Sequence, residues 1–378
     1  MTYNTLHRIG LQGVIAATTR LSRVDGQLGE LIIAGYRLDD IAPYATYEEM
    51  LYLLWHDRLP TKTELSTFQS ELAELRQLPS LAYDVLRKAS ERQLSIMDAL
   101  RIGADISQLN ALSDDPHHLA KHLVAVLPTI VASYWRFLNG ADRVMPDASL
   151  SHAENYLYML SGSVPSSQHT RALDTYLNTV IDHGLNASTF AGRVIIATQS
   201  DMVSAIVGAI GALKGPLHGG APGPALDMVF EIGTPGKAEA YLRAKLDAGE
   251  RLMGFGHRVY KVRDPRADVL NIAAEQFFAD GTQRDLYELA LHVEATAVRL
   301  LEEYKPDRKL QTNVEFYTAL LLHGIGLDND LFTPTFAISR VGGWTAHALE
   351  HLETGRLLRP LVEYQGETDR IFVPLNER

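Results

Sequence analysis

Apolar residues recur at intervals of three and four along most of this chain, and no other feature of the sequence constrains its fold as strongly. After Pro60, for example, Thr61 and Glu64 form a capping-box pattern, and Leu65 and Phe68 begin an apolar series at helical spacing. The same periodicity predicts further helices over residues 43–58, 117–138, 151–161, 168–183, 189–213, 236–248, 267–279, 283–303 and 311–323. Because proline and glycine residues punctuate these segments, the sequence predicts an all-α protein.

One early segment departs from the helical pattern. The residues Val24-Asp25-Gly26-Gln27 have the composition of a hairpin turn, and Leu31-Ile32-Ile33 follows as a short strand. A chain of 378 residues exceeds the size of one typical core, so we expect two lobes. Because no repeat or low-complexity linker divides the sequence, the lobes are expected to share helices or to be joined by more than one crossing of the chain.

Composition narrows the classes of function. The net charge of −11 and the lack of a basic tail disfavour nucleic acid as a partner. The longest apolar run, Met202 to Leu213, is too short to span a bilayer, which needs about 20 residues. The absence of cysteine excludes disulfides and thiolate metal sites, and it fits a reducing compartment. The sequence therefore predicts a cytoplasmic protein without a nucleic-acid or membrane partner.

Residues 254–266 hold the densest concentration of reactive groups in the chain. Glycines on both sides of Phe255 allow a tight bend, and His257 adds a group that exchanges protons near neutral pH. Four cations follow, namely Arg258, Lys261, Arg263 and Arg266. In an acidic protein this gathering predicts an anion-binding loop, although a solvated basic loop would also account for the segment taken alone.

Three other segments place His or carboxylate groups at predicted helix ends. They contain His183 (182–190), His218 (213–221) and Glu315 (312–317). His218 follows a long apolar helix on a bend rich in proline and glycine, where catalytic groups often lie. Each residue also has a structural explanation: His183 as a helix C-terminal cap, His218 as a histidine satisfied by loop backbone, and Glu315 as a complement to a helix dipole.

A further set of arginines, Arg340, Arg356 and Arg359, follows later in the chain. The planar guanidinium suits carboxylates, so the acidic chain is expected to bind a small polycarboxylate rather than a polymer. Two histidine pairs, His118 with His122 and His347 with His351, share helix faces at a spacing of four. Neither pair has HExxH spacing or an obvious third ligand, so no metal site is predicted.

Taken in order, these segments resemble those of the citrate synthase family. The motif Gly256-His257-Arg258-Val259-Tyr260 with Asp264-Pro265-Arg266 is similar to the family's signature. The loop Lys214-Gly-Pro-Leu-His218-Gly-Gly is similar to its GPxHGG loop, and the segment that begins at His183 resembles its HxxNAST segment. The resemblance continues through Phe332-Thr-Pro-Thr-Phe, Ser339-Arg340, Gly343-Trp344 and Leu358-Arg359-Pro360, and it extends from the hairpin to about Gly366.

The resemblance implies a citrate synthase-like multi-helical fold of two domains with a short N-terminal β-hairpin. By analogy, residues 1–219 and 322–378 form a discontinuous large helical domain, and residues 220–321 form a small helical domain. The short chain resembles the dimeric type of the family, with an active site in the cleft between the domains. The implied reaction condenses acetyl-CoA with oxaloacetate and hydrolyses the thioester, which yields citrate and CoA without a metal or redox cofactor.

The resemblance also implies roles for individual residues. Glu315 would be the catalytic base, His218 the donor that stabilises the enol, and His257 the group that polarises the ketone and protonates the alkoxide. The substrate carboxylates would be bound by His183, Arg266 and Arg340, with Arg359 contributed by the partner subunit of a homodimer. The candidates for binding the phosphates of CoA are Arg258, Lys261 and Arg263.

The sequence departs from the family's pattern in three places. Glu315 stands where the family usually has aspartate, which lengthens the side chain by one methylene. The loop after His218 continues Ala221-Pro222-Gly223-Pro224 where many members have Ala-Asn, and Ser95-Ile96-Met97 replaces a common His-Pro-Met.

These departures leave two alternatives open. One is a 2-methylcitrate synthase that uses propionyl-CoA, because one methylene discriminates by only about 1–3 kcal/mol. The other is a non-catalytic ligand-binding homologue. The presence of the full set of histidines and arginines argues against that second alternative, because a binding protein needs neither an acid nor a base.

Overall fold

A computed structural model describes residues 9–11, 13–111, 113–219, 222–279 and 283–378 of the chain, and its described part contains sixteen α-helices and three short strands. The all-α prediction is confirmed. The helices are α1 (Leu38–Ile41), α2 (Tyr47–His56), α3 (Lys62–Glu74), α4 (Ser80–Glu91), α5 (Ile96–Ser107), α6 (Pro116–Leu138), α7 (His152–Ser161), α8 (Ser167–Val180), α9 (Ala187–Ile196), α10 (Met202–Leu213), α11 (Pro222–Ile232), α12 (Pro235–Asp247), α13 (Pro265–Phe277), α14 (Arg284–Tyr304), α15 (Val314–Gly324) and α16 (Phe332–Thr354).

The predicted hairpin is present. Strands β1 (Ser22–Asp25) and β2 (Glu30–Ile33) pair antiparallel, with Ser22 opposite Ile33, and the turn between them spans residues 26–29. A third strand, β3 (Tyr36–Arg37), extends the sheet on the other side of β2 and was not predicted. Leu31 and Ile33 are buried, so one face of β2 packs on the helical body.

The predicted helix over residues 189–213 is wrong in one respect, because two helices, α9 and α10, occupy that range. The chain breaks between them at Gln199, which has a left-handed φ of 64°. Asp201 then caps the second helix by accepting a hydrogen bond from the Ser204 N–H at 2.8 Å. The periodicity analysis missed helices α1, α4, α5 and α11, and it gave no range for α16, which was expected to be helical only around His347 and His351.

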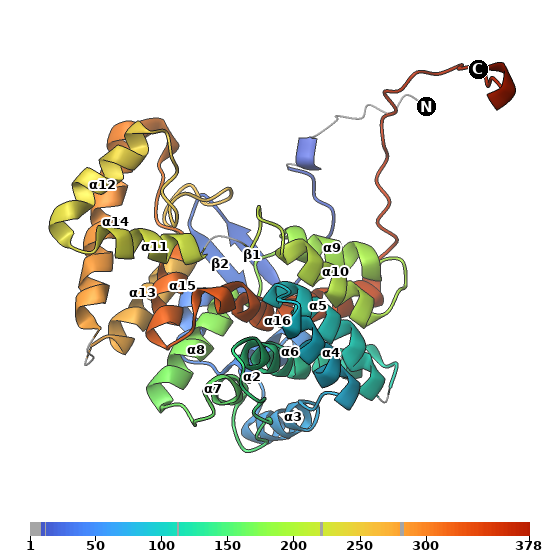
Figure 1. The fold of residues 1–378 in the computed structure, drawn as a ribbon, viewed down its shortest axis with the longest axis horizontal. Coiled ribbons are helices and arrows are strands. Elements are labelled where there is room, and N and C mark those ends of the chain that lie inside the picture. Colours follow the sequence, from blue (N-terminus) through green and yellow to red (C-terminus); the bar gives the residue numbers. More distant parts are fainter. Residues whose placement is uncertain (1–8, 12, 112, 220–221, 280–282) are drawn as a thin grey trace.

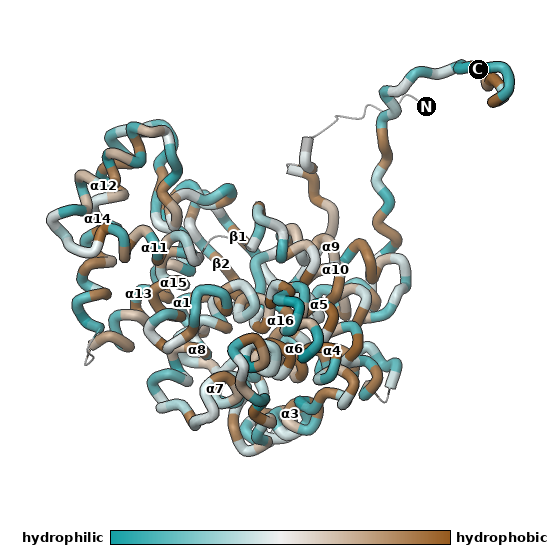
Figure 2. The backbone as a smooth tube through the Cα atoms, viewed as in Figure 1, coloured by the Kyte–Doolittle hydropathy of each residue, from teal (hydrophilic) through white to brown (hydrophobic). Residues whose placement is uncertain are grey.

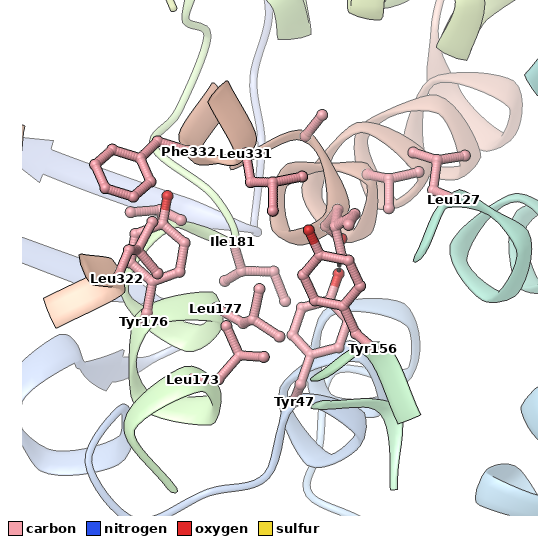
Figure 3. Packing of buried hydrophobic residues seen from close by; sticks show 14 of the residues in the cluster. Tyr47, Leu127, Tyr156, Leu173, Tyr176, Leu177, Ile181, Leu322, Leu331 and Phe332 are labelled. Atoms are coloured by element: carbon pink, nitrogen blue, oxygen red, sulfur yellow. Dashed lines mark hydrogen bonds between the residues drawn. The ribbon is translucent and has the colours of Figure 1, made fainter. Parts of the chain in front are cut away.

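Helix α16 lies at the centre of the fold and is buried along most of its length. It contacts α2, α6, α8, α9 and α10. Figure 3 shows aromatic and aliphatic side chains of α2, α7 and α8 packed around it, among them Tyr47, Tyr156 and Leu177. The hydroxyl of Tyr47 donates to backbone carbonyls of α16, at 3.0 Å to Ile338 and 2.7 Å to Ser339. These polar contacts fix the axial position of α16 against its neighbours.

Glycine permits the closest approach to α16. A Cβ added to Gly343 would lie 2.9 Å from Oδ1 of Asp182 and still closer to the backbone oxygen of Ile181. The segment that follows α8 therefore runs directly against this face of α16. That contact places residues 182–184, which include the predicted site residue His183, beside the central helix.

Helices α11, α12, α13 and α14 form a group on one side of the molecule (Figure 1). Helix α12 packs on α14, α11 packs on α15, and α13 contacts both α15 and α8. This arrangement agrees with a second lobe in the middle of the sequence, while the domain boundaries at 219 and 322 stay a prediction. Figure 2 shows hydrophobic and hydrophilic residues alternating along the helices, as expected for helices with one buried face.

Beyond α16 the chain leads away from the helical body (Figure 1). It is exposed at nearly every residue from 355 onward and contains one short 3-10 helix, Leu375–Glu377, near its end. We call residues 355–378 the C-terminal arm. Several of its large apolar side chains are exposed, including Ile371 and Phe372. Within the described residues, no helix is long and apolar enough to cross a membrane.

The close approach at Gly343 leads to a stability prediction. We expect Gly343→Ala to lower the free energy of unfolding by about 1–3 kcal/mol, because the added methyl group meets the backbone oxygen of Ile181 and the buried side chain of Asp182. As a matched control, Gly236→Ala in α12 places its methyl group in open space and is expected to change stability by less than about 1 kcal/mol. Urea denaturation of both variants tests this, and equal effects would contradict the packing argument.

Candidate active site

Two loops pair to form the base of the candidate site. The N–H of Gly256 donates to the carbonyl of Gln311 at 2.7 Å, and the N–H of Asn313 donates to the carbonyl of Gly254 at 2.9 Å. Gly254 and Gly256 both have left-handed φ values, 85° and 83°, as the tight bend requires. The pairing therefore places His257 next to the start of α15, where Glu315 lies.

The imidazole of His257 has one nitrogen committed to the backbone. Its Nδ1 accepts hydrogen bonds from the N–H groups of Val259 at 3.1 Å and Tyr260 at 3.2 Å. The ring proton consequently resides on Nε2, which lies 3.4 Å from a guanidinium nitrogen of Arg266. Two donors side by side favour an oxygen acceptor between them. Burial, with the charge of Arg266, lowers the pKa of His257 to about 4.

His183 is part of the same cluster of rings. Its Nε2 lies 3.0 Å from the hydroxyl of Tyr260, and its ring centroid lies 5.7 Å from that of His257. The explanation of His183 as a helix cap is not supported, because its ring contacts Tyr260 rather than a carbonyl of α8. Burial, reinforced by the charges of Arg266 and Arg340, lowers the pKa of His183 well below its usual value.

Arg266 is held by a buried carboxylate. Its Nε and Nη2 donate to the two oxygens of Asp264 at 3.0 and 2.7 Å, and both side chains are almost completely buried. Burial alone would lower the pKa of Arg266, but the Asp264 carboxylate raises it. The same carboxylate accepts the N–H of Val314 at 3.3 Å, which fixes the N-terminus of α15 to the arginine.

Glu315 lies in the first turn of α15, behind the cap residue Asn313, whose Oδ1 accepts the Glu315 N–H at 3.0 Å. The helix dipole therefore favours the charged form of Glu315, but it does not dominate the pKa of this side chain. Burial raises the pKa of Glu315 to about 7, despite the opposing charge of Arg266. A carboxylate whose pKa lies near neutrality is suited to accept a proton at physiological pH.

His218 is oriented by side chains rather than by loop backbone alone. Its Nε2 lies 2.8 Å from the hydroxyl of Ser188 and 3.3 Å from the N–H of the same residue. The indole N–H of Trp344 donates to that hydroxyl at 3.0 Å and fixes it from the other side. Burial, with the charge of Arg340, lowers the pKa of His218 to about 4. Ser188 thus engages Nε2 and leaves Nδ1 available to a ligand.

Arg340 is a buried cation on the inner face of α16. Its Nε donates to the carbonyl of Val180 at 2.6 Å, and its guanidinium lies over the ring of Phe336 at 4.6 Å. Burial lowers the pKa of Arg340 to about 10, although Asp182 partly offsets this effect. A desolvated arginine of this kind is prepared to bind an anion.

Electrostatic interactions show that these groups converge. Arg340 lowers the pKa of His183 and of His218, while Arg266 lowers the pKa of His183, His257 and Glu315. The structure therefore brings six predicted site residues into one neighbourhood: His183, His218, His257, Arg266, Arg340 and Glu315. Together they provide one base near neutrality, uncharged imidazoles and two buried cations.

Four other predicted residues lie outside this cluster. Arg359 is exposed on the C-terminal arm, and Arg258 and Lys261 are exposed on the loop after His257. Arg263 is engaged by the carboxylates of Asp268 and Glu294. The proposed roles of these four stay predictions. Gly220 and Ala221, in the loop after His218, lie outside the described residues.

A hollow of about 290 Å³ lies beside the His257 loop. Lys261, Arg263 and Lys309 provide positive charge at its walls against the single carboxylate of Glu302, and Val262 and Leu310 provide apolar surface. This mixture is suited to a ligand that carries both phosphate and an apolar ring.

Three of the four histidines considered for a metal, His122, His347 and His351, have other partners. Nε2 of His122 lies 3.1 Å from the carbonyl of Ser107, and His347 and His351 both contact Arg193. Within the described part of the chain, no group of three or more histidine or acidic residues is arranged to hold a metal ion.

Sequence reasoning missed the groups that hold the site residues in place, namely Tyr260, Asp264, Ser188 and Trp344. All four lie in motifs that were singled out, so proximity in sequence was an available signal for them. Asp182 precedes His183 directly, but its partner His347 lies far away in sequence and could only be found from the fold.

Comparison with known proteins agrees with this geometry. The family described as "Citrate synthase, C-terminal domain" matches residues 10–361. The chain belongs to the citrate synthase family. It is 42% identical over 380 residues to the citrate synthase of Haloferax volcanii, with 98% of each chain covered. It is also 37% identical to a 2-methylcitrate synthase of Mycobacterium tuberculosis. That alignment covers 96% of this chain and 91% of the Mycobacterium protein.

A solved citrate synthase has the same fold. It is the enzyme of Thermoplasma acidophilum in a ternary complex with carboxymethyl coenzyme A and oxaloacetate. The two structures superpose with a TM-score of 0.87 at 32% sequence identity, and the superposition covers 98% of this chain and 99% of the Thermoplasma chain. Citrate synthases are acyltransferases that act on acyl-CoA and oxaloacetate, so the protein is an enzyme of that class.

The raised pKa of Glu315 predicts how stability depends on pH. The folded protein holds the Glu315 proton up to about pH 7, whereas the unfolded chain releases it near 4.5. Stability from this group is therefore complete below pH 4.5 and is lost as pH rises towards 7. Relative to Glu315→Gln, the wild type should lose at most about 3 kcal/mol of unfolding free energy across this window.

Chemical denaturation at pH 4.5, 6 and 7.5 measures this difference. The depressed pKa values of the three site histidines act with the opposite sign, but they are present in both proteins and cancel in the comparison. A constant difference between wild type and variant across the pH range would contradict the raised pKa.

Proposed function

We propose that this protein joins the methyl carbon of acetyl-CoA to the ketone carbon of oxaloacetate and then hydrolyses the thioester, which gives citrate and CoA. One observation carries the proposal: the carboxylate of Glu315, whose pKa lies near 7, lies in the same cluster as uncharged His218 and His257. Two buried arginines in that cluster shift the pKa values of these groups. Carbon–carbon bond formation at a weakly acidic methyl group needs this combination of base, hydrogen-bond donors and anion-binding groups.

In the first step, Glu315 removes a proton from the methyl group of acetyl-CoA. The thioester oxygen gains negative character and accepts a hydrogen bond from Nδ1 of His218. For that role the ring proton must lie on Nδ1, and the backbone N–H of Ser188 supports this tautomer by donating to Nε2 at 3.3 Å. The low pKa of His218 keeps the ring uncharged, so it donates a hydrogen bond without transferring a full charge.

In the second step, the enol carbon attacks the ketone carbon of oxaloacetate. His257 presents its Nε2 proton because Nδ1 is held by two backbone N–H groups. It hydrogen-bonds to the ketone oxygen and donates the proton to the alkoxide that forms. The water molecule that then adds to the thioester carbon returns a proton to His257. The proton that Glu315 took up passes to the sulfur, so CoA leaves as the thiol and both residues regain their starting state.

The two carboxylates of oxaloacetate bind to Arg266, Arg340 and His183. Asp264 holds Arg266 from behind through a two-point interaction, so the remaining face of the guanidinium is presented in a defined orientation. For CoA, the exposed cations Arg258 and Lys261 flank the approach, and the adjacent hollow offers Lys309 as a further charge. Arg263 is retained as a candidate, although its own carboxylate partners compete for it. This mechanism uses no metal or redox cofactor.

We further propose a cytoplasmic homodimer in which Arg359 completes the site of the partner subunit. Support comes from the C-terminal arm, which extends away from its own helical body and exposes large apolar side chains at Leu361, Val362 and Ile371. Burying these side chains on a second copy would stabilise the assembly and would carry Arg359 across the interface.

Thiol release from acetyl-CoA and from propionyl-CoA, each with oxaloacetate, tests the acyl specificity. We expect a higher kcat/KM with acetyl-CoA. A clear preference for propionyl-CoA would establish 2-methylcitrate synthesis instead, and no release with either thioester would contradict the enzymatic function.

Variants of Glu315 test the base. Glu315→Gln is expected to reduce kcat by at least about 100-fold, while oxaloacetate still binds by calorimetry. The wild-type kcat/KM should rise with pH and level off above an apparent pKa near 7, because only ionised Glu315 accepts the proton. Substantial turnover in Glu315→Gln would contradict this assignment.

Mixed dimers test the role of Arg359. Glu315→Gln and Arg359→Leu homodimers should each be nearly inactive. A hybrid of the two keeps one complete site, because intact Glu315 of one chain meets intact Arg359 of the other. Random mixing in equal amounts should restore about a quarter of wild-type activity. If Arg359 acts within its own chain, no activity returns.

A further inference from the structure

A buried arginine beneath the site connects three segments of the chain. Arg193 lies on α9 and is only 3% exposed. Its Nη1 donates to Nδ1 of His347 at 2.8 Å and to Oε2 of Glu350 at 2.9 Å, and its Nε donates to Nδ1 of His351 at 3.4 Å. None of the reaction steps described above uses these groups, although burying so many polar side chains is costly unless they are paired.

One branch of this network leads to the active site. Because Nδ1 of His347 accepts from Arg193, its ring proton lies on Nε2, which is 3.2 Å from the carboxylate of Asp182. Asp182 is completely buried and also accepts the hydroxyl proton of Ser22, whose oxygen accepts the N–H of Gly184 at 2.8 Å. The residues on both sides of His183 are thereby held, one to α16 and one to β1.

The second branch leads to the C-terminal arm. Because Nδ1 of His351 accepts from Arg193, its Nε2 carries the proton and donates to the carbonyl of Arg356 at 3.1 Å. Gly355 lies directly against the His351 ring, where an added Cβ would overlap the ring atoms. The direction in which the arm leaves α16 is therefore set by the contact of His351 with the carbonyl of Arg356, which lies three residues before Arg359.

Glu350 provides the countercharge for Arg193 and joins the N-terminal segment to the network. Its Oε1 accepts from the Thr19 hydroxyl at 3.1 Å and from the N–H of Arg20 at 2.9 Å. The cation is thus neutralised internally, and its three donor contacts have fixed directions. Arg193 is therefore suited to hold neighbouring segments in fixed positions rather than to bind a substrate anion.

We propose that Arg193 is a positioning residue for two active sites of the dimer. Through His347 and Asp182 it holds His183 of its own subunit, and through His351 it holds the start of the arm that delivers Arg359 to the partner. The second half of this inference rests on the proposed function of Arg359.

Single substitutions of the two histidines test the branches without removing the buried arginine. Both His347→Leu and His351→Leu are expected to raise the KM for oxaloacetate roughly tenfold or more, while the KM for acyl-CoA changes little. His347→Gln retains an acceptor for Arg193 and a donor for Asp182, so it should restore most of the oxaloacetate affinity.

The matched control is His122→Leu, which removes another buried histidine that is hydrogen-bonded to backbone. It should lower Tm without changing either KM. If His347→Leu and His351→Leu only lower Tm, as this control does, or if His347→Gln fails to restore oxaloacetate affinity, the positioning role is overturned.

Hybrid dimers with Glu315→Gln separate the two branches. The two chains carry different affinity tags, are co-expressed, and the hybrid dimer is purified. Only one of its two active sites can work. That site takes Glu315 and His183 from the histidine variant, and it receives the C-terminal arm of the Glu315→Gln chain. The His351→Leu hybrid should then show a normal KM for oxaloacetate, because the working site receives an intact arm. The His347→Leu hybrid should keep its raised KM, because its defect lies in the same subunit.

The opposite pattern, or the same pattern for both hybrids, overturns the inference. Its failure is distinguishable from that of the Arg359 proposal, which is tested independently by the hybrid of Arg359→Leu with Glu315→Gln. If that hybrid is active and the His351→Leu hybrid still has a raised KM, the trans role of Arg359 stands and the role assigned to His351 is wrong.

Discussion

The pair formed by Asp264 and Arg266 is the interaction on which the rest of the site depends. One buried carboxylate binds the guanidinium at two points, caps the start of α13 through the Arg266 N–H and accepts the Val314 N–H at the start of α15. Three parts of the site therefore meet at Asp264: the His257 loop, the helix that carries Arg266 and the helix that carries Glu315. Removing either partner of a buried pair leaves an uncompensated charge, so the geometry of the site is strongly tied to this contact.

Burial gives the charged groups their chemical roles by shifting acids and bases in opposite directions. It raises the pKa of Glu315 to about 7 and lowers the pKa values of His218 and His257 to about 4. Near neutral pH the carboxylate is consequently a useful base, while the imidazoles stay uncharged and donate hydrogen bonds. The positive charge of Arg340 reinforces the pKa shift of His218, and that of Arg266 reinforces the shift of His257 and partly opposes the shift of Glu315.

Much of the site was predictable because its motifs combine chemistry with backbone requirements. Gly254 and Gly256 have the left-handed conformations that the tight bend implied, and His257 and Arg266 meet as the motif suggested. Other features depended on contacts between distant residues. The break at Gln199 was hidden because apolar spacing continues across it, and the pairing of His347 and His351 with Arg193 was invisible from their spacing of four, which is equally compatible with a metal site.

Local periodicity was enough to predict the helical class and the hairpin, and short motifs were enough to single out the six residues that the structure brings together. The tertiary structure was needed to assign which nitrogen of His218, His257 and His347 carries the ring proton, since that depends on Ser188, on the backbone of residues 259–260 and on Arg193. It also decided the ionisation of Glu315, because desolvation arises from elements far apart in the chain. Local patterns specify which groups are present, whereas burial and pairing specify what those groups do.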